Sequence, residues 1–155
     1  MWTPRGSQLI YQHQSPYQSI KLFLDGNHYW LSLNNVMQFH TRECYASHEY
    51  MCKNPLRMVQ NPKKVLIIGG GDGFAARELL KDPRVEEILN VELDHHLIGL
   101  TKQHPVMRIL TEDAFHHPKV KVIAGDGIGF LINSADKYDI IIDDCEYDYT
   151  GQPGG

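Results

Sequence analysis

The sequence contains few cysteines, no long hydrophobic run and no cluster of basic residues. Its three cysteines, Cys44, Cys52 and Cys145, form no Cys-x-x-Cys pair and leave an odd count, which argues against a disulfide scaffold and favours a reduced intracellular protein. No stretch approaches the length of a membrane span, and the first residues lack the apolar segment of a signal peptide. We therefore predict a cytoplasmic protein without a membrane partner.

Positive charge is also sparse. The formal net charge of the 155 residues is −4, and Lys63-Lys64 is the only adjacent basic pair. Nucleic-acid-binding domains usually carry a basic patch, so a nucleic-acid partner is not expected and a cationic small molecule suits the chain better.

Two parts with different periodicity meet near Pro62. In residues 1–61, turn signals at Asp25-Gly26 and Asn34-Asn35 separate short β runs and predict a small β-meander. Its strands are expected over 19–24, 29–33 and 36–39. A helical segment over 43–60 should follow, and Pro55 is expected to kink or end it.

In residues 62–155 strands alternate with helices, which predicts a parallel sheet with flanking helices. The strands are expected over 64–68, 88–93, 120–124 and 138–143, and the helices over 74–81 and 95–103. The predicted fold class is α/β: the β-meander, then the N-terminal half of a Rossmann-like sheet of the class I methyltransferase type.

The most informative motif is the glycine loop at residues 69–73, which follows a buried strand and contains one acid. Glycines let the chain turn sharply and approach a ligand, and Glu92, at the end of the next strand, can accept hydrogen bonds from both ribose hydroxyls. Asp126 follows the third strand. Any one of these acids could simply cap a helix, as we expect of Asp94, but their recurrence after consecutive parallel strands favours a nucleoside site.

Further motifs occur in a fixed order along the chain. They are Ser15-Pro16-Tyr17-Gln18, Gln38-Phe39, Arg42-Glu43, His48-Glu49, the glycine loop, Arg77-Glu78, Glu92-Leu93-Asp94, Gly125-Asp126-Gly127 and Tyr138–Ile142 with a following acid. In order and spacing, over about residues 15–144, this series resembles the polyamine aminopropyltransferases, the spermidine synthase family.

The resemblance implies a reaction of polyamine biosynthesis. An aminopropyl group would pass from decarboxylated S-adenosylmethionine to a diamine such as putrescine, giving spermidine and methylthioadenosine. The donor is a co-substrate, and neither a cofactor nor a metal is implied. The nine histidines, including the pairs His95-His96 and His116-His117, form no recognisable ligand pattern and are expected mainly at the surface.

The resemblance also implies site residues. Asp144 would be the catalytic base, Glu92 would hold the ribose, and Asp72 would face the aminopropyl ammonium. The full donor-binding set is Gln18, His48, Gly69, Gly71, Asp72, Gly73, Glu92, Asp126 and Gly127, in which Asp126 and Gly127 would contact adenine.

Two departures from the family pattern concern the amine. Ser47 replaces a tyrosine just before the His-Glu pair, and Tyr147 occupies the position of a second aspartate after the catalytic acid. Glu146 or Asp148 could supply that acid only if the loop shifts. We expect Ser47, Asp144, Tyr147 and Asp148 to line the amine site, and the accepted amine stays open.

The fourth strand would form an open edge, although Ile140–Ile142 is strongly apolar. A homo-oligomer or a second chain completing the sheet is therefore a possible partner. Two other functions stay open: a methyltransferase that uses intact S-adenosylmethionine, and a non-catalytic nucleoside-binding module. A nicotinamide dehydrogenase is disfavoured because Asp72 would repel a pyrophosphate.

Overall fold

The computed structural model describes residues 6–42 and 46–145. By internal contacts the chain divides into two compact units, with the boundary between Ala46 and Ser47. The two units are described separately below.

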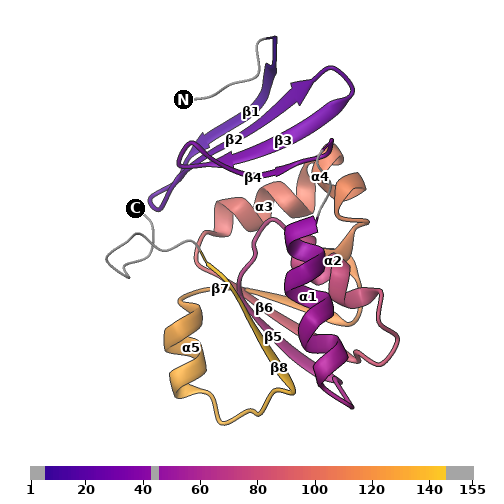
Figure 1. The fold of residues 1–155 in the computed structure, drawn as a ribbon. Helices are drawn as coiled ribbons and strands as arrows, with labels where there is room; N and C mark the ends of the chain where they lie inside the picture. Colours follow the sequence, from indigo (N-terminus) through magenta and orange to yellow (C-terminus); the bar gives the residue numbers. More distant parts are fainter. Residues whose placement is uncertain (1–5, 43–45, 146–155) are drawn as a thin grey trace. The chain divides into compact units, whose positions relative to one another are not determined.

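The first unit is a four-stranded antiparallel sheet in the order β1-β2-β3-β4 (Figure 1). Its strands are β1 (Gln8–Gln14), β2 (Ser19–Asp25), β3 (His28–Leu33) and β4 (Val36–His40). The predicted meander is confirmed over β2 to β4, where Gly26, Asn34 and Asn35 take positive φ at the turns. The prediction missed β1 because its glutamine-rich sequence is largely exposed and lacks clear apolar alternation.

Cross-strand pairs hold this sheet together. Leu22 on β2 lies opposite Leu31 on β3, and both side chains are fully buried. The next pair, Phe23 and Trp30, points to the other face, and its rings stack with centroids 3.9 Å apart. Apolar contacts therefore line both faces of the hairpin.

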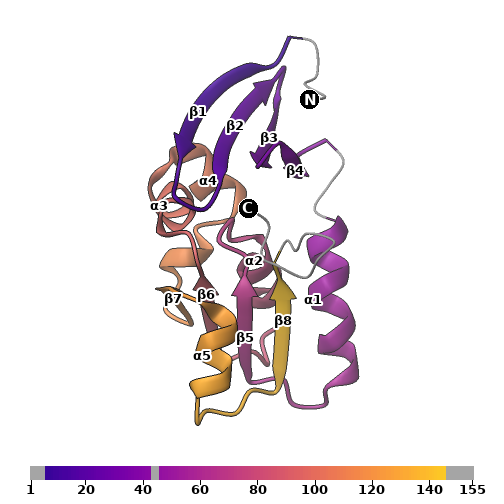
Figure 2. The same ribbon diagram turned by 90° about the vertical axis from the view of Figure 1, so that its left-hand side faces the viewer.

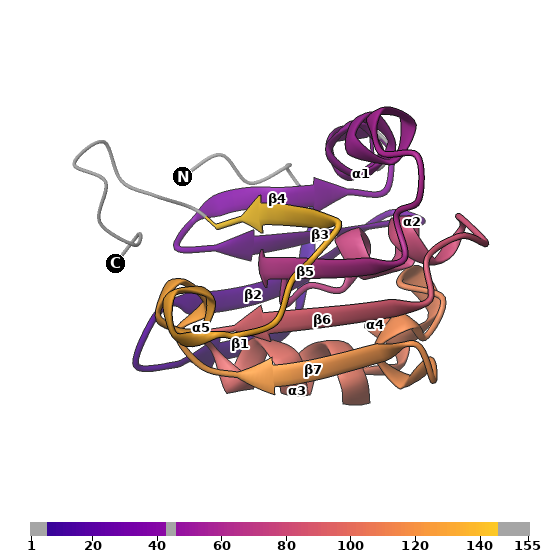
Figure 3. The same ribbon diagram turned by 90° about the horizontal axis from the view of Figure 1, so that it is seen from below.

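The second unit is a parallel sheet in the order β7-β6-β5-β8, visible strand by strand in Figure 3. Its strands are β5 (Lys64–Gly69), β6 (Glu87–Glu92), β7 (Val120–Ala124) and β8 (Ile140–Asp144). Its helices are α1 (Ala46–Met58), α2 (Phe74–Leu80), α3 (His95–Gln103), α4 (Pro105–Leu110), the 3₁₀ turn η1 (Ala114–His116) and α5 (Gly127–Asn133). The predicted α/β class is thus confirmed.

Pro55, which was expected to kink or end this segment, does not end α1. The helix continues to Met58, and the amide of Val59 donates to the carbonyl of Pro55 at 3.0 Å. Cys52 and Leu56 pack into the same core cluster as β5 and α2, so burial stabilises the last turn despite the missing proline donor. The same packing joins α1 to the second unit. The boundary between the two compact units therefore lies between Ala46 and Ser47, earlier in the chain than the expected division between residues 61 and 62.

Three short elements were not predicted: α4, η1 and α5. His104 follows the end of α3 and also caps α4, and Pro105 occupies the first turn of α4. Asp126 caps α5 by accepting a hydrogen bond from the amide of Ile128 at 3.1 Å. None of the helices in residues 6–42 and 46–145 has the length and apolar character of a membrane span.

The two faces of the parallel sheet are covered unequally. Helices α1 and α5 lie on opposite sides of the strands (Figure 2). The α1 side holds the large core cluster, whereas the α5 side buries Leu66, Ile68, Leu89 and Val91. On β8, the terminal strand, Ile141 is 48% exposed. The predicted open edge is therefore observed within the described residues.

Candidate active site

Three acids gather at the carboxyl ends of the parallel strands. Asp72 lies in the loop after β5, Glu92 ends β6 and Asp144 ends β8. Strand order reverses between β5 and β8, because β6 and β7 lie on one side of β5 and β8 on the other. Such a switch point is where open α/β sheets bind ligands.

His48 lies against two of these acids. It comes from the first turn of α1, and its Nε2 is 3.5 Å from Asp72 Oδ2 and 4.0 Å from Asp144 Oδ2. Its ring also contacts Phe74, with centroids 5.4 Å apart. His48 and Asp72 are almost fully buried, and the side chain of Asp144 is 23% exposed. The imidazole therefore stands between two carboxylates at the switch point.

Burial and neighbouring charge perturb Asp144. Desolvation raises its pKa, the Asp72 carboxylate raises it further, and the nearby His48 charge opposes the shift; the resulting pKa is about 7. Asp144 can therefore exchange a proton near neutral pH, which is the property of a general acid or base.

His48 shows the complementary effect. Burial disfavours its charged form, but the attraction of Asp72 and Asp144 outweighs burial, so its pKa is raised above the usual histidine value. Its Nδ1 atom is buried and has no hydrogen-bond partner among the described residues.

Glu92 is tied to the backbone around it. Its Oε2 accepts from the amide of Gly71 at 2.9 Å, and its Oε1 accepts from the amide of Asp94 at 2.9 Å. Burial raises its pKa, while these two hydrogen bonds oppose the rise. Since each carboxylate oxygen has a second lone pair, a fixed Glu92 can still accept two hydroxyl hydrogen bonds.

The glycine loop approaches these acids closely. Gly69 has φ +78°, and a Cβ there would collide with the backbone carbonyl of Asp144. A Cβ on Gly71 would lie 2.5 Å from Cγ of Glu92. Glycine is therefore required at both positions to bring β5, β6 and β8 together.

Two residues that hold this loop were not predicted. The Asn90 amide nitrogen donates to the carbonyl of Gly69 at 2.6 Å, and the Thr101 hydroxyl donates to the carbonyl of Gly71 at 2.7 Å. The sequence signal for Asn90 was an asparagine within an apolar strand, and the structure shows that this side chain is fully buried. Thr101 gave no such signal, because its partner is 30 positions away in the chain.

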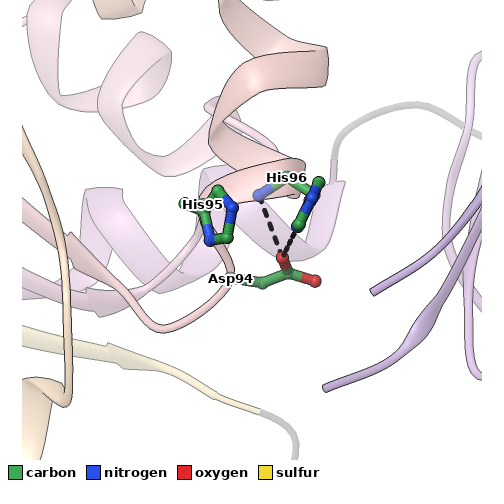
Figure 4. A group of neighbouring side chains, drawn as sticks. All are labelled: Asp94, His95 and His96. Carbon is green, nitrogen blue, oxygen red and sulfur yellow. Dashed lines mark hydrogen bonds and ion pairs between the residues drawn. The ribbon is translucent and has the colours of Figure 1, made fainter. Parts of the chain in front are cut away.

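Asp94, His95 and His96 form a second group with close side-chain atoms (Figure 4). Asp94 caps α3 as expected: its Oδ1 accepts from the amide of His96 at 2.9 Å. The same oxygen lies 3.5 Å from His96 Nδ1, and His95 is exposed. The cap already engages this carboxylate at the positive end of a helix, which disfavours a cation.

The other expected site residues are Asp126, Gly127, Gln18 and Ser47, together with residues outside the described ranges. Asp126 is exposed and caps α5, next to buried Gly127. Gln18 belongs to the first unit, where Ser15 fixes its backbone in a turn. Ser47 is exposed on α1. Glu146, Tyr147 and Asp148 lie outside the described residues, so their roles stay predictions.

Strand order and the acids at the strand ends define a Rossmann-like α/β domain of the class I methyltransferase type. A family model described as "Spermine/spermidine synthase domain" matches residues 44–152. The chain belongs to the spermine/spermidine synthase family.

Individual relatives agree with this family. The chain is 39% identical over 139 residues to polyamine aminopropyltransferase 2 of Aquifex aeolicus, covering 90% of this chain and 28% of that protein. It is 36% identical over 144 residues to spermidine synthase of Schizosaccharomyces pombe, covering 92% of this chain and 47% of the relative.

Solved structures agree as well. A crystal structure of spermidine synthase in complex with the transition state analogue AdoDATO matches with a TM-score of 0.84 at 30% identity, over 95% of this chain and 49% of that chain. Spermidine synthase from Thermotoga maritima matches with a TM-score of 0.81 at 30% identity, over 88% of this chain and 48% of that chain. The chain thus spans half or less of the length of these relatives.

Proposed function

We propose that this chain carries the donor-binding and proton-accepting part of a polyamine aminopropyltransferase. The observation that supports this most strongly is Asp144, a mostly buried acid with a pKa of about 7 beside Asp72 and His48. The donor, decarboxylated S-adenosylmethionine, carries an ammonium and a sulfonium. Among the described residues no lysine or arginine lies within 4.0 Å of these acids, and a buried acidic site of this kind suits such a cation.

The proposed reaction is a substitution at carbon. The amine nitrogen attacks the methylene carbon beside the sulfonium, the carbon–sulfur bond breaks, and sulfur keeps the electron pair as the neutral thioether methylthioadenosine. An alkylammonium has a pKa of about 10, so the attacking amine must first lose a proton. Asp144 accepts that proton, directly or through water, and returns it to solvent.

The other residues position the donor. Glu92, fixed by two backbone amides, accepts the ribose hydroxyls. Asp72 faces the aminopropyl ammonium, while the Gly69–Gly73 loop lets the nucleoside approach the backbone. Asp126 and Gly127 contact adenine in this proposal, and Gln18 covers the sulfur end. Ser47, Tyr147 and Asp148 belong to the amine site.

In this proposal the reaction uses no metal and no organic cofactor, and the donor is a co-substrate. The protein acts in the cytoplasm. We also propose that a second copy of this chain, or a different chain, completes the sheet beside β8. The exposed Ile141 on this terminal strand supports a neighbour there.

The test measures methylthioadenosine release from the decarboxylated donor with putrescine. We expect release that depends on the amine, and a fall of about 10²- to 10⁴-fold in Asp144→Asn with donor affinity retained. Asp143→Asn is the matched control, because it removes the same charge from the adjacent exposed position. Turnover that survives Asp144→Asn would reject the base assignment.

Two outcomes would select the alternatives. Preference for carboxylated S-adenosylmethionine would select a methyltransferase. Nucleoside binding without turnover, at saturating diamine, would select a non-catalytic binding module.

A further inference from the structure

His48 is the nearest cationic group to the buried acids. Among the described residues, no lysine or arginine lies within 4.0 Å of Asp72, Glu92 or Asp144, whereas His48 Nε2 lies within that distance of two of them. Arg77 on α2 is also close, but its guanidinium pairs with Glu78 at 2.7 Å. His48 therefore supplies the positive charge that balances this cluster before any ligand binds.

The charges that act on His48 come from three elements. Asp72 and Asp144, after β5 and β8, favour its imidazolium, and Arg77 on α2 opposes it. The charges of Glu92 and Asp143 act on Asp144, and both favour the protonated form of Asp144. The protonation equilibrium of His48 therefore depends on the two carboxylates that face Nε2. A ligand cation placed among these carboxylates would favour the neutral imidazole.

The two ring nitrogens of His48 have different surroundings. Nε2 lies at ion-pair distances from both carboxylates, 3.5 Å from Asp72 Oδ2 and 4.0 Å from Asp144 Oδ2. Nδ1 is buried without a hydrogen-bond partner among residues 6–42 and 46–145. When the ring becomes neutral, the proton on Nδ1 is therefore the one that leaves at least cost, while Nε2–H keeps its contacts.

We propose that His48 is an exchangeable counter-ion of the donor site: its imidazolium neutralises Asp72 and Asp144 in the free protein, and the cationic donor replaces it with release of the Nδ1 proton. This inference rests on the proposed function, and it adds a proton-linked step and a basis for discrimination between ligands. The donor brings two positive charges, its ammonium and its sulfonium, and one proton leaves, so the cluster gains one net positive charge, which offsets part of the charge of its three carboxylates.

Two consequences follow. Donor binding competes with protonation of His48, so donor affinity rises with pH, by up to about tenfold per unit, while free His48 is still protonated. Methylthioadenosine carries neither the ammonium nor the sulfonium, so its affinity lacks this dependence. After transfer, reprotonation of His48 restores the balance and favours exchange of the neutral product for a new donor.

The experiment is calorimetric titration of the chain near neutral pH in two buffers with different ionisation enthalpies. The probes are decarboxylated S-adenosylmethionine and methylthioadenosine. We expect proton release with the first and none with the second. His48→Asn should lower the number of protons released per donor bound. His117→Asn, which changes an exposed histidine before β7, should behave as wild type.

Asp144 also titrates near neutral pH, so its contribution must be separated. Proton release that persists in Asp144→Asn assigns the proton to His48. Imidazole ¹⁵N shifts of the wild-type chain give a second measurement that needs no variant. His48 should change from imidazolium to the Nε2–H tautomer with the decarboxylated donor, and should stay charged with methylthioadenosine.

Undiminished proton release in His48→Asn, or an imidazolium that persists in the donor complex, would overturn the inference while leaving the proposed function intact. Failure of both ligands to bind would instead reject the proposed function, and the inference with it.

Discussion

The two ends of the parallel sheet in the second unit both carry charged side chains, but in opposite arrangements. At the amino ends the charges are paired and reach solvent: Lys63 Nζ lies 2.9 Å from Glu86 Oε1, and the half-buried Lys64 places its Nζ 3.3 Å from the exposed Asp136 Oδ2. At the carboxyl ends Asp72 and Glu92 are buried, and among the described residues neither has a lysine or arginine within 4.0 Å.

This difference separates structural from functional charge. An exposed ion pair contributes about 0–1 kcal/mol and is screened by salt, so the amino end gains little from its pairs. Buried acids without a paired lysine or arginine oppose folding and shift their own pKa values. Such an arrangement is retained where a ligand supplies the missing cation, which is the role proposed for the carboxyl end.

The largest expected contrast is within β6, which begins at Glu87 and ends at Glu92. Glu92→Ala should weaken methylthioadenosine binding by about 100-fold or more, since hydrogen bonds to a charged group contribute about 1.5–3 kcal/mol each. Glu87→Ala, at the exposed end of the same strand, should bind normally. Calorimetric titration measures both affinities, and equal losses would contradict the assignment of Glu92 to the ribose.

A smaller contrast concerns stability and pH. The pKa of Asp144 is raised from near 4 to about 7, so between these values the folded chain holds more protons than the unfolded chain. The free energy of unfolding should therefore fall as pH rises through this window. Asp144→Asn removes this loss and should be more stable than wild type at pH 8 by about 1–3 kcal/mol, with a smaller difference at pH 4.

Urea unfolding at pH 4 and pH 8 measures this effect. At pH 4 Asp144 is protonated, so Asp144→Asn removes no charge beside His48 there and should change the free energy of unfolding little. Asp136→Asn, at the amino end, is the matched control and should show no gain at pH 8. If Asp144→Asn is no more stable than wild type at pH 8, burial of the charged Asp144 carboxylate does not destabilise the folded chain.

The smallest expected effect is at the amino end. Lys63→Ala breaks the exposed pair with Glu86 and should change the free energy of unfolding by about 0.5 kcal/mol or less. The change should disappear at high salt, and methylthioadenosine affinity should stay the same. Thermal melts at low and high salt check this, and a large salt-resistant loss would remove the distinction between the two ends.

Sequence patterns predicted much of the fold because local signals agree with the tertiary context. The predicted strand over 120–124 matches β7, and the helix over 95–103 matches α3, where Asp94 and His104-Pro105 mark the ends. The patterns failed where local and tertiary preferences conflict. Pro55 lies inside α1 because Cys52 and Leu56 are buried, and α5 was missed because it has few buried residues.

The candidate site divides in the same way. The glycine loop and Glu92 follow from a strand–loop pattern, and the structure places both at the carboxyl ends of neighbouring parallel strands. Asn90 and Thr101 were missed because their hydrogen bonds join positions far apart in the chain. Nor could any local pattern show that a histidine from α1 meets acids from two different strands.

By itself, then, the sequence determined the α/β class, the order of the strands along the chain and the acids at their ends, because periodicity, caps and glycines act within a few residues. Only the tertiary structure decided that β8 pairs with β5, and that His48, Asp72 and Asp144 therefore share one buried space. The perturbed pKa values of Asp144 and His48 arise from that shared burial and mutual charge, which depend on distances in space rather than on spacing in the chain.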